Sequence, residues 1–115
     1  MHREDAAWLA GLIDGEGCLD SPRGNARLRI KMTDLDVVLR AASIMGASTY
    51  GEPGFKAGYK PCLVAQLTGE RAVEVMLAVL PWMGARRSAK ITEIVMAHTA
   101  KRSRKLHPIH EELAA

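Results

Sequence analysis

The sequence has few aromatic residues, few cysteines and no long apolar run. Aromatic residues make up 4% of its 115 residues, and Cys18 and Cys62 are its two cysteines. Two thiols this far apart are too few for a disulfide scaffold or a zinc site, so we interpret them as reduced thiols of a cytoplasmic protein. No apolar stretch approaches the roughly 18 residues of a transmembrane helix, and the N-terminus lacks the apolar core of a secretory signal. We therefore expect no membrane partner.

The composition is that of one small globular domain. Hydrophobic residues make up 48% and charged residues 25% of the chain, which excludes global disorder. A length of 115 residues suits a single domain. We expect that domain to span residues 1–102, followed by a basic and polar tail, residues 103–115.

Positive charge is concentrated late in the sequence. The formal net charge is +3, and residues 84–105 hold seven of the 16 basic residues but a single acidic one, Glu93. A basic cluster of this kind favours a polyanion, either nucleic acid or an anionic membrane surface. The alternative is a solvated helix face with a basic tail.

Hydrophobic periodicity and turn-forming residues predict an α+β fold with antiparallel hairpins. The predicted helices span residues 4–14, 34–45, 69–79 and 86–102, and the predicted strands span 18–20, 26–32, 47–52 and 62–68. Gly15 and Gly17 are expected to end the first helix. The second helix is expected to turn Leu35, Val38, Leu39, Ala42 and Met45 inward.

Residues 26–32 alternate between apolar and basic side chains. A period of two places the apolar side chains on one face of a strand and the basic ones on the other. The apolar set is Leu28, Ile30 and Met32, and the basic set is Arg27, Arg29 and Lys31. This strand is expected to expose a row of three cations.

The segment WLAGLIDGEG, residues 8–17, is the most informative part of the sequence. Ala10 and Gly11 are small enough to let another helix approach closely. Asp14 and Glu16 follow at the C-terminal end of the helix, where the helix dipole is already negative. Two carboxylates there are unfavourable without a cation, and oxygen ligands suit Mg²⁺.

Residues 9–17 resemble the LAGLIDADG motif of homing endonucleases and differ from it at Gly15 and Glu16. The order of the predicted elements is also similar, so the resemblance covers about residues 4–100. It implies an αββαββα fold in which an antiparallel sheet forms a saddle with the helices packed on one face. It further implies a site-specific double-strand DNA endonuclease that uses Mg²⁺ or Mn²⁺ and belongs to a mobile element such as an intron or a phage.

A single motif in the chain implies a homodimer on a roughly palindromic DNA site. The dimer interface implied by the resemblance consists of Trp8, Ala10, Gly11 and Asp14. Asp14 has an alternative role as a structural capping carboxylate. The flanks show no protein-splicing residues, so we expect a freestanding or intron-encoded protein.

The resemblance also assigns roles at the site. Glu16 corresponds to the motif's metal-binding and catalytic carboxylate, and its alternative is an exposed turn residue. Arg86 stands nearest to a lysine that family members carry after a Leu-Pro turn; it is expected to act in catalysis or to contact a phosphate. The expected DNA contacts are Arg23, Arg27, Arg29, Lys31, Lys56, Lys60, Arg87 and Lys90.

Two other functions are compatible with the sequence. The first is a non-cleaving protein of the same fold that binds DNA or RNA, as a maturase or a regulator. The second is a structural dimer whose basic tail binds nucleic acid without sequence preference. Mg²⁺-dependent cleavage of a plasmid library would exclude the first, and salt-dependent binding without a preferred site would favour the second.

Overall fold

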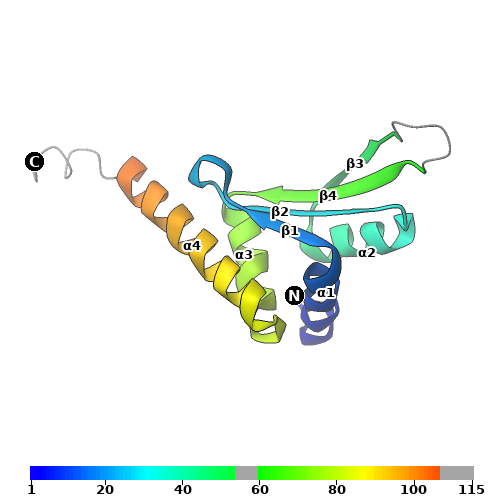
Figure 1. The fold of residues 1–115 in the computed structure, drawn as a ribbon, viewed down its shortest axis with the longest axis horizontal. Helices are drawn as coiled ribbons and strands as arrows, with labels where there is room; N and C mark the ends of the chain where they lie inside the picture. The colour runs from blue at the N-terminus through cyan, green and yellow to red at the C-terminus, as the bar shows by residue number, and fades with distance from the viewer. Residues whose placement is uncertain (54–59, 107–115) are drawn as a thin grey trace, which may run out of the picture.

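Four antiparallel strands form one sheet, and the helices pack against only one of its faces (Figure 1). The computed structural model describes residues 1–53 and 60–106. The order of elements agrees with the predicted α+β fold. The bounds are α1 Arg3–Glu16, β1 Gly17–Asp20, β2 Arg27–Met32, α2 Leu35–Met45, β3 Ser48–Glu52, β4 Cys62–Thr68, α3 Glu70–Val79 and α4 Ala85–Leu106, with short 3₁₀ turns at Pro22–Gly24 and Leu80–Trp82.

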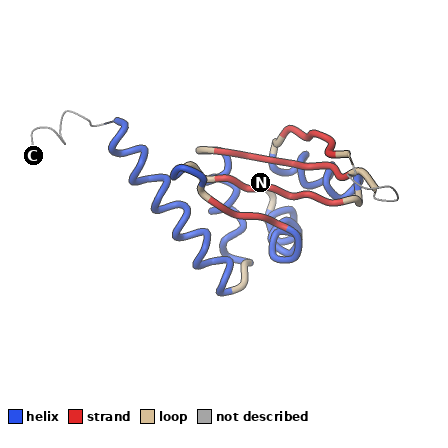
Figure 2. The backbone as a smooth tube through the Cα atoms, turned by 45° about the horizontal axis from the view of Figure 1, so that its top comes forward, coloured by secondary structure: helices blue, strands red, loops and turns tan. Residues whose placement is uncertain are grey.

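The strands lie in the order β1-β2-β4-β3, so two hairpins join through their second strands (Figure 2). Arg29 of β2 pairs with Cys18 on one side and with Gln66 on the other. Leu28 and Ile30 are fully buried, and Arg29 between them points to the opposite face. The alternation predicted for residues 26–32 is therefore confirmed, and the face that carries the cations has no helix over it.

The core lies between the sheet and helices α1 to α3. Leu9 and Ile13 of α1 are fully buried at the predicted helical spacing. In α2 the prediction is partly wrong, because Leu35 and Leu39 are 49% and 53% exposed. The buried side of α2 consists of Val38, Ala41, Ala42 and Met45, so the two leucines lie on the exposed side of the helix.

Helix α1 ends later than predicted and leads directly into β1. Gly15 is helical, and Glu16 is the last helical residue. Gly17 follows with extended torsion angles, φ −80° and ψ 149°, instead of the left-handed conformation expected of a terminating glycine. A Cβ atom on Gly17 would lie 2.8 Å from Cγ2 of Ile13, so only glycine fits this close approach. Glu16 is thereby placed at the junction of helix and sheet.

Helix α4 is longer than the predicted segment 86–102. It runs to Leu106, so the first four residues of the predicted tail are helical, and residues 107–115 lie outside the described part of the chain. Ile91 and Ile94 anchor α4 in the core. None of the helices in residues 1–53 and 60–106 has both the length and the apolar character needed to cross a membrane.

Candidate nucleic-acid interface and active site

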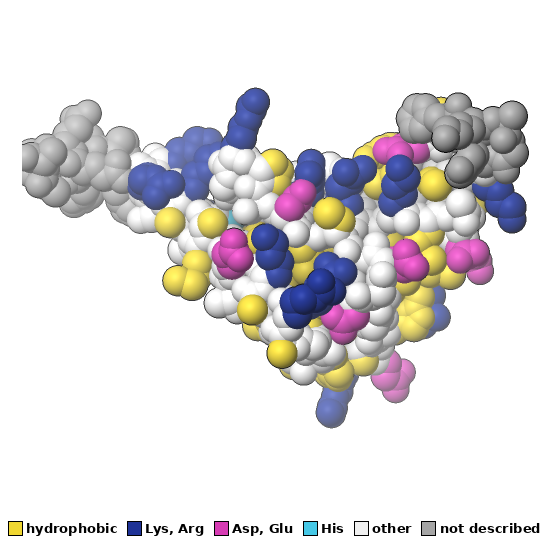
Figure 3. All heavy atoms as spheres, in the orientation of Figure 1, with side chains coloured by type: hydrophobic (Ala, Val, Ile, Leu, Met, Phe, Trp, Pro, Cys, Tyr) yellow, Lys and Arg dark blue, Asp and Glu magenta, His cyan; other side chains and the backbone are white. Residues whose placement is uncertain are grey.

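The uncovered face of the sheet carries the row of cations predicted for β2. Arg27 and Arg29 are partly exposed there and Lys31 is exposed. Figure 3 shows Lys and Arg side chains along the sheet side of the molecule, with carboxylates among them. We call this surface, with its residues from all four strands, the outer face of the sheet. It is the face that a large polyanion could reach.

Two carboxylates pair with these cations, one from each edge strand. Asp20 of β1 receives a bidentate pair from Arg27, with Nε–Oδ1 and Nη2–Oδ2 distances of 2.8 and 2.5 Å. Glu52 of β3 pairs with Lys31 and lies 3.6 Å from Nη2 of Arg29. Sequence reasoning missed both carboxylates, since their pairing depends on strand order and register.

The pairs affect the ionisation of both carboxylates. The hydrogen bonds from Arg27 hold the pKa of Asp20 below its ordinary value. The bond from Lys31 does the same to the pKa of Glu52. Both groups are therefore ionised at neutral pH, and the outer face neutralises much of its own positive charge.

Arg29 also belongs to a polar network on this face. Its Nη2 donates to the hydroxyl of Tyr50 at 3.4 Å, and that hydroxyl donates to Oε1 of Gln66 at 3.4 Å. Gln66 of β4 lies directly opposite Arg29 of β2, and Tyr50 of β3 is paired with Val64, two residues from Gln66 along β4. The sequence offered only the alternation within each strand as a signal for them.

The remaining sequence-predicted cations lie around the sheet. Arg23 is exposed at the β1–β2 turn with a left-handed φ of 55°, and Lys60 is exposed just before β4. Lys56 lies outside the described residues. Arg23 and Lys60 therefore sit near the strand ends and apart from the central row on β2.

Asp14 joins the end of α1 to the start of α4. Its Oδ2 accepts a hydrogen bond from the backbone N–H of Gly84 at 3.4 Å. Its backbone carbonyl accepts one from Nη2 of Arg87 at 3.5 Å. A carboxylate at a helix N-terminus and a cation at a helix C-terminus are both favourable, so this contact gives Asp14 a structural role within one protomer.

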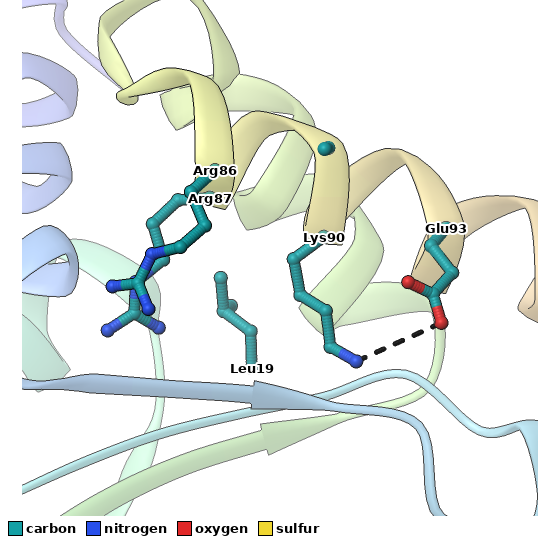
Figure 4. A pocket seen from close by; sticks show the side chains of 6 residues that line it. Leu19, Arg86, Arg87, Lys90 and Glu93 are labelled. Carbon is teal, nitrogen blue, oxygen red and sulfur yellow. Dashed lines mark ion pairs between the residues drawn. The ribbon is translucent and has the colours of Figure 1, made fainter.

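A hollow of about 380 Å³ opens where α4 begins (Figure 4). Its walls include Leu19 of β1 and the three cations Arg86, Arg87 and Lys90. In Figure 4 the arginines extend from the first turn of α4, while Lys90 points toward β1 and pairs with Glu93 at 3.9 Å. The structure thus brings together three of the predicted site residues within one turn of helix and beside the end of α1.

Glu16 is exposed at the end of α1. Among the described residues it forms no ion pair and no side-chain hydrogen bond. No group of three metal-ligating side chains occurs in residues 1–53 and 60–106. Mg²⁺ commonly takes one or two protein carboxylates and completes its shell with water and phosphate oxygens, so a free carboxylate such as Glu16 fits that donor set.

The predicted interface residues of α1 fall on different sides of the helix. Ala10 is fully buried in the core of its own protomer, so its assignment to an interface with a second copy is wrong. Trp8 is half-buried beneath the guanidinium of Arg40, 4.1 Å from the ring centroid. Gly11 is exposed, and a Cβ atom added there would have nothing within 4 Å; the same holds for Gly15.

A second polar cluster ties the β1–β2 turn to α4. The N–H of Ala26 donates to Nδ1 of His98 at 3.3 Å, and Nζ of Lys101 donates to the carbonyl of Arg23 at 2.6 Å. The other ring nitrogen of His98 lies 3.1 Å from Oε1 of Glu70, which also pairs with Arg102. Sequence reasoning assigned no role to His98, because its partners are far away in the chain.

No protein-family model and no curated protein matches this sequence. Solved structures do match. The homing endonuclease I-CvuI in complex with an I-CreI target and Mg has a TM-score of 0.66 and 18% identity, over 90% of this chain and 73% of that chain. I-CvuI with its own target and Ca gives 0.64 and 17%, over 84% and 67%.

A third structure, an archaeal intron-encoded homing endonuclease complexed with DNA, I-Vdi141I, has a TM-score of 0.61 and 15% identity. The match covers 90% of this chain and 73% of that one. At these identities the likeness establishes a shared fold.

Proposed function

We propose that this chain, which has the fold of the LAGLIDADG homing endonucleases, is a site-specific double-strand DNA endonuclease acting as a homodimer. One observation carries the proposal. Glu16, the second acidic residue of the motif, is exposed and unpaired among the described residues, at the point where α1 enters the sheet. Arg87, one of the cations of the α4 hollow, donates to the backbone carbonyl of Asp14, two residues before that junction.

The outer face of the sheet is suited to duplex DNA. The major groove is about 12 Å wide and admits a two-stranded β-ribbon. Arg27 and Arg29 could read guanine edges, and Lys31 could contact a phosphate. Arg23 and Lys60 extend this surface at the strand ends. Two of the matched homing endonuclease structures contain DNA and the third contains its target, which supports the same choice of substrate.

A homodimer would bring two such faces to one duplex. Ala7, Gly11 and Gly15 recur every four residues, which places them on one side of α1, and the two glycines have open space beside them. Small residues in this arrangement let two helices approach closely. A twofold axis beside α1 would place the two Glu16 carboxylates near each other, on a DNA site of matching symmetry.

The chemistry proposed is hydrolysis of a phosphodiester in each strand. Glu16 would supply a carboxylate ligand for Mg²⁺ or Mn²⁺, and such a metal, when bound, would activate water and stabilise charge on the phosphate. Arg86, which is exposed and lines the hollow, would donate a hydrogen bond to a phosphate oxygen. Asp14 and Arg87 keep the start of α4 against the end of α1.

The experiment replaces Glu16 with Gln, which keeps the shape and removes the charge. Cleavage of a plasmid library in Mg²⁺ should fall by at least about 100-fold, the size of loss common for a catalytic group. DNA binding should persist or tighten, because one negative charge leaves the surface of each protomer. Glu74→Gln, an exposed change of the same type on α3, is the matched control and should cut normally.

Two outcomes would contradict the proposal. Cleavage by Glu16→Gln at the wild-type rate would remove the catalytic assignment. A wild-type protein that selects a DNA site but cuts nothing with Mg²⁺ or Mn²⁺ would instead be a binding protein of this fold. If the gene belongs to a mobile element, the DNA target of the protein should be the sequence that this element interrupts. The DNA that flanks the gene tests this prediction.

A further inference from the structure

The cations of the outer face are held by carboxylates on both sides. Asp20 on β1 and Glu52 on β3 approach β2 from opposite directions, and β4 lies between Glu52 and its partners. Val64, which is opposite Lys31 in β4, is fully buried at this crossing. The pairs made by Glu52 therefore cross the middle of the outer face and are not isolated contacts at its rim.

This arrangement changes what DNA can gain from the face. A phosphate that approaches Arg27 or Lys31 competes with a carboxylate already in place, so it replaces one anion by another. Contacts to phosphates carry no sequence information and supply most of the affinity for arbitrary DNA. The two carboxylates consequently weaken the part of binding that does not depend on sequence.

Base recognition is affected differently. Arginine has five N–H donors, and Asp20 occupies only the side of Arg27 formed by Nε and Nη2. The Nη1 donors and the second Nη2 donor stay available for the O6 and N7 acceptors of guanine. A guanidinium fixed by one carboxylate also loses less side-chain entropy when it binds a base. The pair thus favours a base edge over a phosphate.

We infer that Asp20 and Glu52 are specificity-determining residues, which suppress binding to arbitrary DNA and hold Arg27, Arg29 and Lys31 in position for base edges. This inference rests on the proposed function in that it takes the outer face as the DNA-binding surface. It does not depend on cleavage. It concerns the acidic members of the surface, which the sequence analysis left without a role.

The test uses Asp20→Asn and Glu52→Gln, which keep the side-chain shape and remove one charge each. Asp36→Asn on α2 and Glu74→Gln on α3 remove the same charge from exposed positions away from the outer face. Each protein is titrated with the duplex that the wild type selects from a random library and with a scrambled duplex of equal length. Both titrations are repeated over a range of salt concentrations.

Asp20→Asn and Glu52→Gln should bind the scrambled duplex about 10-fold more tightly than the controls do, and their ratio of specific to scrambled affinity should fall at least about 10-fold. The slope of log affinity against log salt should steepen by about 0.9 for each cation released to a phosphate. Circular dichroism checks folding, and Asp20→Ser is a second variant if Asp20→Asn fails to fold.

Unchanged ratios and slopes in the two variants, relative to Asp36→Asn and Glu74→Gln, would overturn the inference. So would a wild-type protein that selects no sequence. Failure of the proposed function has a different signature, because a chain that selects a duplex without cutting it would still give the altered ratios if the two carboxylates act as inferred.

Discussion

Single residues place the proposed catalytic group. Gly17 is required beside Ile13, where a Cβ atom would collide with the backbone, and this contact lets the chain pass from α1 to β1 without a loop. Glu16 is held at that passage. Its counterpart two residues earlier, Asp14, is engaged with Gly84. Two carboxylates of one motif thus have different surroundings and are expected to have different roles.

Acid should weaken the ion pairs of Asp20, Glu52 and Glu70. Arg27, Lys31 and Arg102 hold the pKa values of these three carboxyls below their ordinary values, so the folded state binds fewer protons than the unfolded state. Their contribution to stability is present above the ordinary carboxyl range of roughly pH 4 and is lost as the pH falls through the lowered values.

The measurement is denaturant unfolding at a series of pH values below about 5. Asp20→Asn and Glu52→Gln should each make the free energy of unfolding less dependent on pH in this range. Asp36→Asn serves as the control, because the structure gives that carboxyl no cationic partner among the described residues. If the free energy of unfolding depends on pH in the same way in the wild type and all three variants, the ion pairs do not form in solution.

At the scale of elements, α4 holds the β1–β2 turn in place. His98 accepts the N–H of Ala26, so its Nδ1 carries a lone pair, and Lys101 binds the carbonyl of Arg23. Arg23 has a left-handed φ, which is unfavourable for a residue with a Cβ atom and needs such support. The C-terminal half of α4 therefore helps to orient a predicted DNA contact at the end of the sheet.

Replacing His98 with Ala should release this turn. The amide of Ala26 should exchange its hydrogen faster, and the free energy of unfolding should fall by about 0.5–1.5 kcal/mol for the lost hydrogen bond. Nuclear magnetic resonance of amide exchange measures the first effect. Thr99→Ala, at the next and exposed position of α4, should leave the Ala26 amide protected. If the Ala26 amide exchanges its hydrogen at the same rate in both variants, the hydrogen bond to His98 does not hold the turn.

At the scale of the whole molecule, the exposed side of α1 is expected to pair with a second copy. Gly11→Leu adds a side chain where the protomer has open space, so the fold of each protomer should survive. The added volume should separate the two helices and weaken the dimer by about 1–3 kcal/mol or more, as overpacking does. DNA cleavage should fall as the dimer weakens.

Sedimentation at micromolar concentration measures the assembly. The wild type and a Thr99→Leu control, which adds a similar side chain on exposed α4, should sediment as dimers, and Gly11→Leu should sediment largely as a monomer. A wild-type protein that is monomeric while it cuts both strands would contradict the dimer.

Local patterns in the sequence determined much of this protein. The alternation in residues 26–32 fixed which side chains of β2 face the core, because a strand has a period of two. The motif WLAGLIDGEG pointed to the fold that the solved structures share. The bounds of β4, residues 62–68, also follow from a local apolar run between turn formers.

Other features came only from the tertiary structure. Ala10 and Gly11 look equally suited to an interface, yet neighbouring helical residues point about 100° apart, and only packing shows which one the core takes. The partners of Arg29 and Lys31 come from β3 across β4, which requires the strand order β1-β2-β4-β3. Periodicity is a property of adjacent residues, whereas strand order, register and the docking of α4 depend on contacts between distant parts of the chain.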